Sequence, residues 1–250
     1  MSILQIIALA FAGFIGGIAN AVAGGGTFFT FAAFVAFGMP TLEANATSAV
    51  ALVPGSIATG AAYRHETSAH WREILPFVLI GVIGGIAGAS LLIAIGDDGF
   101  RPLVPWLTGS ATLLFAFSGR IRHYVRKTAG HHSVGKVPGL ALVALSTMYG
   151  GFFGAGLGIV LLAALSVVGS GDFHKANATK NAVAVVSQSM AVALFIAGGL
   201  VRWPQAIVTI CAAIAGGYLG VVVARRVPEP IVRGAVVAVG AVLTLVYFSR

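Results

Sequence analysis

Charged side chains are scarce in this sequence. Asp, Glu, Lys and Arg make up 9% of the 250 residues, whereas hydrophobic residues make up 58% and the mean hydropathy is +0.98. A soluble domain contains about 25% charged residues, so this chain has too few charges to cover a surface that faces water. The range 74–95 contains no charged residue and exceeds the roughly 20 apolar residues that span a bilayer. The shortage of charge therefore predicts an all-α integral membrane protein that crosses the bilayer several times.

Cysteine occurs once, as Cys211 inside an apolar run, which excludes an intrachain disulfide and a cysteine-based zinc site. The six histidines lie in or near predicted loops and show no ligand spacing. The apolar segments contain no paired nucleophile and base, and no stretch resembles a nucleotide-binding loop. We therefore expect no metal, no cofactor and no enzymatic activity. Lys and Arg outnumber Asp and Glu by 15 to 7, but they lie in short loops, where they indicate membrane topology rather than nucleic-acid binding.

Carboxylates are missing from the middle of every predicted membrane segment. A cation carrier is expected to place an acid at mid-depth, because a charge there is expensive and is usually functional. Glu43 and Asp172 directly precede long apolar segments, so we expect them to cap helices rather than to bind cargo. All the carboxylates lie in predicted loops or at segment ends: Glu43, Glu66, Glu73, Asp97, Asp98, Asp172 and Glu229.

One pattern occurs twice. The tetrapeptide ANAT stands at 44–47 and again at 176–179, and the same shift of 132 residues aligns Trp71 with Trp203. It also aligns the glycines at 84, 85 and 88 with those at 216, 217 and 220. Self-similarity at a fixed spacing indicates duplicated structural units. The sequence thus predicts two homologous membrane repeats, 1–118 and 137–250, joined by a linker, 119–136, whose basic residues place it in the cytoplasm.

Each repeat contains about five apolar segments, of which the second is too short to span. The range 27–38 covers roughly 18 Å as a helix, against a hydrocarbon core of about 30 Å, and it follows a glycine cluster. We therefore expect a broken or re-entrant helix in each half. Counting it as a crossing makes the halves inverted and puts the basic loops on the linker's side. The predicted segments are 3–22, 27–38, 43–62, 74–95 and 101–118, then 138–154, 159–169, 176–199, 205–224 and 231–248.

Each ANAT opens the long third segment of its half and begins a polar stripe. Asn177, Lys180 and Asn181 share one helix face by their i, i+3 and i+4 spacing. Small polar residues also hold membrane helices together, and a lysine near a helix end can reach the interface. Because no carboxylate accompanies Lys180, and because glycine turns lead into helix N-termini that favour anions, we predict an anion site. Its expected residues are Asn45, Thr47, Ser48, Asn177, Thr179, Lys180, Asn181, Gln188, Gly24, Gly25, Gly26, Gly156 and Gly158.

Two long stretches resemble a known family. GGIANAVAGGGTFFTFAAFVAFGMPTLEANATSAVALVP and GGFFGAGLGIVLLAALSVVGSGDFHKANATKNAVAVV are similar to the two signatures of the TauE/SafE-type sulfite exporters, also called the toluene-sulfonate uptake permease family. The resemblance covers essentially the whole chain. It implies a bacterial inner-membrane protein of a family with varied cargo, for which small sulfur-containing anions such as sulfite or organosulfonates are proposed, and it does not fix the cargo of this member. Leu157 stands where the first half has Gly25, so the two halves need not contribute equally.

These observations predict a secondary transporter that exports a small anion by alternating access between its repeats. The alternative is a passive channel, because some channels also use two inverted halves with repeated Asn-containing turns. Those turns normally carry Asn-Pro-Ala, whereas alanine replaces the proline here, so the channel ranks second. The expected partners are the anionic substrate and the lipid bilayer, with no nucleic acid, and the sequence leaves a homo-oligomer open.

Overall fold

The computed structural model describes residues 1–62, 64–128, 136–168, 173–223 and 229–249, and within these ranges it contains helices and no strands. The helices of the first half are α1 (Ile3–Ala23), α2 (Gly26–Ala36), α3 (Thr41–Ala62), α4 (Arg64–Ala69), α5 (Trp71–Phe100), η1 (Arg101–Leu103) and α6 (Val104–Thr128). Those of the second half are α7 (Lys136–Phe152), α8 (Leu157–Val168), α9 (Phe173–Ala197), α10 (Trp203–Val223) and α11 (Glu229–Phe248). The prediction of an all-α protein is confirmed.

Four stretches of the described chain are long and apolar enough to cross a membrane: Ile3–Ala21, Trp71–Ile121, Lys175–Ala197 and Ile231–Phe248. The second runs through both α5 and α6. Large apolar side chains such as Phe11, Trp106 and Tyr218 are exposed on the outside, as expected where lipid is the solvent. The protein is therefore a multi-pass membrane protein.

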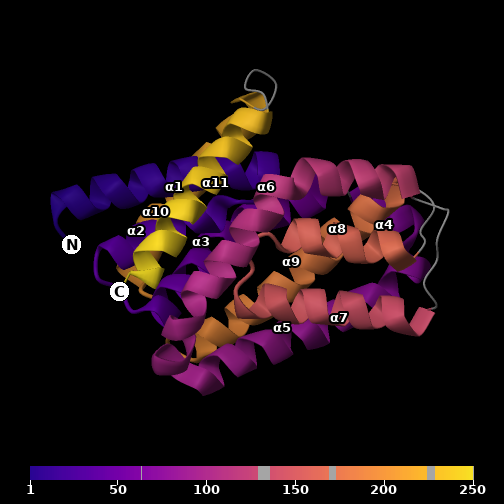
Figure 1. The fold of residues 1–250 in the computed structure, drawn as a ribbon, viewed down its shortest axis with the longest axis horizontal. Coiled ribbons are helices and arrows are strands. Elements are labelled where there is room, and N and C mark those ends of the chain that lie inside the picture. Colours follow the sequence, from indigo (N-terminus) through magenta and orange to yellow (C-terminus); the bar gives the residue numbers. More distant parts are fainter. Residues whose placement is uncertain (63, 129–135, 169–172, 224–228, 250) are drawn as a thin grey trace.

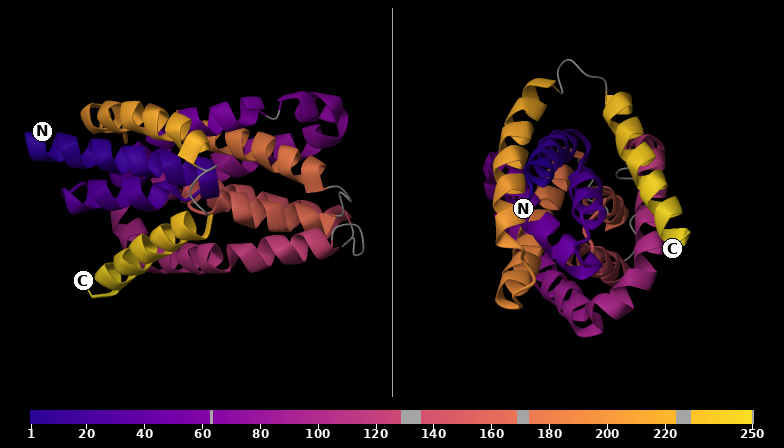
Figure 2. Two further views of the ribbon diagram at one scale, coloured as in Figure 1. Left: turned by 90° about the horizontal axis from the view of Figure 1, so that it is seen from above. Right: turned by 90° about the vertical axis from the view of Figure 1, so that its left-hand side faces the viewer.

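Most helices lie along the long axis of the molecule, and both termini lie at the same end of it (Figures 1 and 2). The most extensive helix–helix interfaces join α1 with α10 and α5 with α7. Glycines allow these helices to approach closely: a Cβ on Gly17 would lie 2.2 Å from the Ala213 carbonyl oxygen, and one on Gly88 would lie 2.0 Å from that of Met148. Small residues thus hold the bundle together, as they do in other membrane proteins.

The long helices α3 and α9 pack against each other in opposite directions. Arg202, just beyond the end of α9, donates to Glu43 in the first turn of α3, with Nη2 2.9 Å from Oε1. At the other end, Lys175 in the first turn of α9 is paired with Glu73 at the start of α5. The start of α3 therefore lies beside the end of α9, and the start of α9 lies beside the start of α5.

Aromatic side chains fill the core around α2. Phe28, Phe31 and Phe34 are almost fully buried. The ring of Phe31 meets that of Phe153 edge-on, and the ring of Phe28 meets that of Phe115 in the same way. These contacts attach the short α2 to α6 and to the turn between α7 and α8. Tertiary packing therefore fixes the position of α2 in the bundle.

The predicted linker, 119–136, is partly helical. Helix α6 continues through Thr128, so its basic residues Arg120, Arg122, Arg126 and Lys127 belong to the last turns of that helix. Residues 129–135 lie outside the described part of the chain. The division into repeats at 118 and 136 remains a prediction.

Candidate functional site

Glycine turns interrupt the chain between α1 and α2 and between α7 and α8. Gly24 ends α1 in the left-handed region with φ 77°, and Gly156 precedes α8 with φ 79°. Only glycine adopts such angles without strain. Two helices therefore begin inside the bundle, where their first N–H groups have no partner within the helix and carry partial positive charge.

A cavity of about 410 Å³ lies between these two turns and the long helices α3 and α9. A water molecule takes up about 30 Å³, so the cavity has room for a small anion and several waters. Thr27 near the start of α2 and Gly158 near the start of α8 both line it. The polar side chains in its wall are Asn20, Thr27, Asn45, Ser56, Asn177, Lys180, Asn181 and Gln188.

The charge of the cavity comes from a single helix. Of the side chains that line it in the described structure, Lys180 on α9 is the only ionisable one, since no Asp, Glu or His borders the cavity. No group of acidic, histidine or cysteine residues in the described chain is arranged to hold a metal ion. Amides, hydroxyls, one ammonium group and two helix N-termini form a lining that favours an anion.

Two hydrogen bonds join the halves across the cavity. Asn45 Nδ2 on α3 donates to the Phe152 carbonyl oxygen at the end of α7, over 3.1 Å. Ser56 Oγ on α3 donates to Gln188 Oε1 on α9, over 3.0 Å. Asn45 is 2% exposed, and its Oδ1 atom has no donor among the described residues.

The structure brings seven of the residues predicted from sequence to the cavity wall. These are Gly24, Asn45, Gly158, Asn177, Lys180, Asn181 and Gln188. They come from both halves and from four separate helices or turns.

The remaining predicted residues lie outside this wall and have structural contacts. Thr47 Oγ1 accepts a hydrogen bond from the Arg202 backbone N–H, Ser48 is hydrogen-bonded to Thr30 on α2, and Thr179 Oγ1 donates to the Lys175 carbonyl oxygen. Gly25, Gly26 and Gly156 shape the turns. A Cβ on Gly26 would lie 2.4 Å from the Gly16 carbonyl oxygen, and one on Gly25 would lie 2.8 Å from the side chain of Val236.

Sequence reasoning omitted three polar side chains of the lining from the expected site. Asn20 is a single amide in the apolar α1, Thr27 lies in the first turn of α2, and Ser56 lies further along α3 than the ANAT tetrapeptide. The signal for Asn20 was available, because an amide four residues before a glycine break is unusual in an apolar helix. Its direction toward the cavity depends on the packing of α1, which one sequence does not show.

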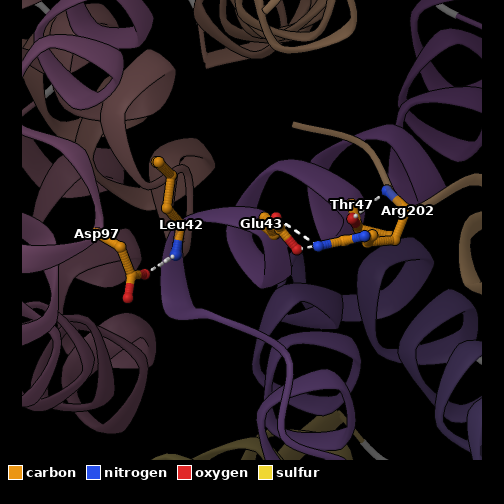
Figure 3. Close-up of polar contacts among 5 residues, drawn as sticks. All are labelled: Leu42, Glu43, Thr47, Asp97 and Arg202. Carbon is orange, nitrogen blue, oxygen red and sulfur yellow. Dashed lines mark hydrogen bonds and ion pairs between the residues drawn. The ribbon is translucent and has the colours of Figure 1, made fainter. Parts of the chain in front are cut away.

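A polar cluster fastens the start of α3 (Figure 3). Asp97 Oδ1 accepts hydrogen bonds from the Leu42 N–H at 2.8 Å and from Thr41 Oγ1 at 2.7 Å. Asp97 therefore caps this helix, whereas Glu43, which was expected to do so, turns to Arg202 instead. Hydrogen bonding and charge attraction from Glu43 raise the pKa of the Arg202 guanidinium. Asp172, the other expected cap, lies outside the described residues.

Comparison with known proteins identifies the family. The family model described as sulfite exporter TauE/SafE matches residues 9–247. The chain belongs to the TauE/SafE family. This confirms the resemblance seen in the two glycine and ANAT stretches, and it makes the protein a membrane transporter rather than an enzyme.

Relatives within the TauE/SafE group carry transporter names. A protein from Haemophilus influenzae described as a probable membrane transporter protein is 28% identical over 244 residues, covering 96% of this chain and 94% of its own length. The probable membrane transporter protein YfcA of Escherichia coli is 25% identical over 256 residues, covering 100% of this chain and 93% of its own. One from a Sinorhizobium species is 27% identical over 195 residues, covering 77% and 72%.

Proposed function

We propose that this TauE/SafE protein is a secondary transporter that exports a small anion, such as sulfite or an organosulfonate, across the bacterial inner membrane. The observation that carries the proposal is the lining of the central cavity. Lys180 is its only ionisable side chain among the described residues, it stands among amides and hydroxyls, and two helices begin at the cavity. The ammonium group of Lys180, the amide and hydroxyl donors and the two helix N-termini attract an anion, whereas a metal cation would meet an ammonium group and no carboxylate among the described lining residues.

Alternating access needs two related halves, and the contacts support an inverted pair. Ser56 and Gln188, which are hydrogen-bonded to each other, are 132 residues apart, the same shift that aligns the sequence repeats. Helices α3 and α5 begin at residues 41 and 71, while α9 and α10 begin at 173 and 203, which is the same shift again. Equivalent helices that cross in opposite directions at equivalent positions are related by a two-fold axis perpendicular to them.

The other helices also pack in equivalent pairs when each helix is replaced by its counterpart in the other half. Helix α1 packs on α10 as α7 packs on α5, and α2 packs on α11 as α8 packs on α6. In the inverted arrangement α1 with α2, and α7 with α8, form two re-entrant hairpins that enter from opposite sides and meet at the cavity. Inverted repeats with broken helices around a central site are a recurrent transporter design.

The basic residues support the proposed orientation. The last turns of α6, the segment 64–72 and Lys175 at the start of α9 lie at the end of the bundle opposite to the termini. The positive-inside rule places that end in the cytoplasm. Both termini then face the outside of the membrane.

The test is anion flux in liposomes that contain the purified protein. We expect saturable sulfite flux that organosulfonates inhibit, and a loss of about tenfold or more in Lys180→Ala, because a hydrogen bond to a charged group contributes about 1.5–3 kcal/mol. The control is Lys175→Ala, which removes a lysine from the same helix outside the cavity and should keep the flux.

Three outcomes are informative. Flux that is unchanged in Lys180→Ala would move the anion site to the amides and helix N-termini. Flux that falls equally in Lys175→Ala would mean that the loss reflects the net charge of α9. Rapid passive permeation of neutral solutes without anion flux would replace the transporter with a channel.

A further inference from the structure

The cavity is open toward one end of the bundle and closed toward the other. Ala21 and Gly24 line it and are exposed. Phe153 and Gly156, which stand 132 residues later, are buried. Helix α1 runs inward from the end of the bundle that holds the termini, so its exposed turn faces the opposite end, where α6 ends and α7 begins (Figure 1). The cavity is therefore open toward this second end, the linker side, and closed toward the first, the terminal side.

A short segment at the end of α5 covers the terminal side. Helix α5 is broken at Gly96, whose φ of 65° and ψ of −172° are open only to glycine. Residues 97–100, the α5 end segment, follow the break. Phe100 is fully buried, and its ring centroid lies 5.6 Å from that of Phe152 and 6.3 Å from that of Phe153. Because Phe153 lines the cavity, the α5 end segment lies directly behind the closed wall.

Asp97 attaches the α5 end segment to the start of α3. Its Oδ1 atom accepts hydrogen bonds from the Leu42 N–H at 2.8 Å and from the Thr41 hydroxyl at 2.7 Å (Figure 3). Asn45, one turn further along α3, lines the cavity and donates to the Phe152 carbonyl oxygen at the end of α7. The start of α3 is therefore held to α5 and to α7 on the closed side of the cavity.

The ion pairs near these helix starts have a different role. Arg202 binds both carboxylate oxygens of Glu43 and joins α3 to the turn before α10. Lys175, which stands 132 residues after Glu43, is paired with Glu73 and joins α9 to α5. Each pair thus fixes a long helix to a helix that it packs against. Both pairs are formed while only one side of the cavity is closed, so the ion pairs do not decide which side is closed.

We propose that the α5 end segment is the gate of the cavity on the terminal side, with Gly96 as its hinge and Asp97 as its latch. Opening breaks the two hydrogen bonds of Asp97 to α3 and moves Phe100 away from the closed wall. The glycine absorbs the change of backbone angles. Asp97 is half-buried, so water can take the place of its two donors. The inference rests on the proposed function, because a transporter needs access to its cavity from both sides.

The experiment measures access to the cavity from each side of the membrane. Ala49→Cys in a Cys211→Ser background places a thiol in the cavity wall, and the probe is the small impermeant anion 2-sulfonatoethyl methanethiosulfonate. Right-side-out and inside-out vesicles offer the two sides, and the terminal side is the one on which Ser2→Cys is labelled. We expect fast labelling from the linker side and slow labelling from the terminal side. Asp97→Ala should speed labelling from the terminal side about tenfold, because hydrogen bonds to a charged group hold the closed form.

Two controls separate the latch from a general loosening of the fold. Asp97→Asn keeps an acceptor oxygen and should stay close to the rate of the parent. Asp98→Ala removes the same charge at the exposed neighbouring position and should leave the rate unchanged. Labelling from the linker side should be equal in all these variants, whereas a loosened fold would raise the rate from both sides.

A cross-link tests the gate in the opposite direction and also serves if Asp97→Ala fails to fold. Thr41→Cys and Asp97→Cys, joined by a bifunctional methanethiosulfonate in the Cys211→Ser background, fix the α5 end segment to α3. The link should abolish sulfite flux in liposomes until a reductant cleaves it. Binding of sulfite to the cross-linked protein in detergent should persist, because the linker side stays open.

The outcomes distinguish the gate from the proposed function. An unchanged rate in Asp97→Ala, or sulfite flux that survives the cross-link, overturns the gate and leaves an anion transporter. Labelling of the parent from neither side, or equally from both, overturns the gate as well. If labelling from the terminal side depends on Asp97 but no anion flux is found, the gate stands and the proposed function fails.

Discussion

At the scale of single residues, Gly85 shows how close the helices of this bundle are. A Cβ at this position would lie 2.3 Å from the carbonyl oxygen of Ser187 and 2.9 Å from its Cα. Both atoms belong to the backbone of α9, so no side-chain rotation relieves the contact. Helix α5 can lie this close to α9 only because residue 85 has no side chain.

Gly85→Ala should therefore destabilise the protein. Overpacking a tight contact costs about 1–3 kcal/mol, and we expect a lower midpoint of thermal unfolding in detergent. The matched control is Gly234→Ala on α11, where an added Cβ meets nothing within 4 Å. Equal midpoints for the two variants would show that α5 moves away from α9 at little cost.

The polar stripe of α3 shows what one sequence predicts at this scale and what it does not. Asn45 and Ser48 were both expected in the anion site, yet Asn45 lines the cavity while Ser48 is hydrogen-bonded to Thr30 on α2. The period fixes which residues neighbour each other along a helix. Rotation of the helix about its axis depends on the elements around it, and those contacts are formed only in the folded chain.

At the scale of elements, the apolar runs predicted the helices closely. The run 3–22 became α1, and the runs 43–62 and 176–199 became α3 and α9. The short α4 was missed because its sequence, RHETSA, has no apolar run. The cap of α3 was assigned to the wrong carboxylate for a related reason: Asp97 is 55 residues from Leu42 in sequence and reaches it only through the fold.

Asp97→Ala should loosen the first turn of α3. The variant loses the acceptor for the Leu42 N–H, and loss of a helix cap costs about 0.5–2 kcal/mol. We expect a lower unfolding midpoint in detergent, with Asp97→Asn closer to the wild type because an amide oxygen can still accept. Asp98→Ala, at the exposed neighbouring position, is the control. A midpoint as low in Asp98→Ala would assign the effect to the net charge of this end of the chain.

At the scale of the whole molecule, the proposed inverted arrangement of the two halves predicts the side of the membrane on which each terminus lies. Ser2 and Ser249 are exposed at the end of the bundle that holds both termini, and His123 is exposed near the far end of α6. In a Cys211→Ser background, Ser2→Cys and Ser249→Cys should react with a membrane-impermeant maleimide on intact spheroplasts. His123→Cys should react only after the membrane is permeabilised.

Opposite labelling of Ser2→Cys and Ser249→Cys would contradict the inverted arrangement. Two inverted halves with an odd number of crossings each give an even total, which places both termini on the same side of the membrane. Labelling of all three cysteines on one side would require an even number of crossings between α1 and α6. Cytoplasmic labelling of the termini with outside labelling of His123→Cys would keep the inversion and reverse the orientation.

The hydrogen bond between Ser56 and Gln188 bears on the ancestry of such a chain. If the halves descend from one duplicated gene, the ancestor was a half-length protein that formed a dimer of two oppositely inserted copies. The residue at this position then contacted the same residue of the other copy. Fusion into one gene let each copy change alone. A homodimer would carry two lysines at the position of Lys180, or none, whereas Ser48 occupies the equivalent position in this chain. Duplication followed by divergence is thus a route to a cavity with a single positive charge.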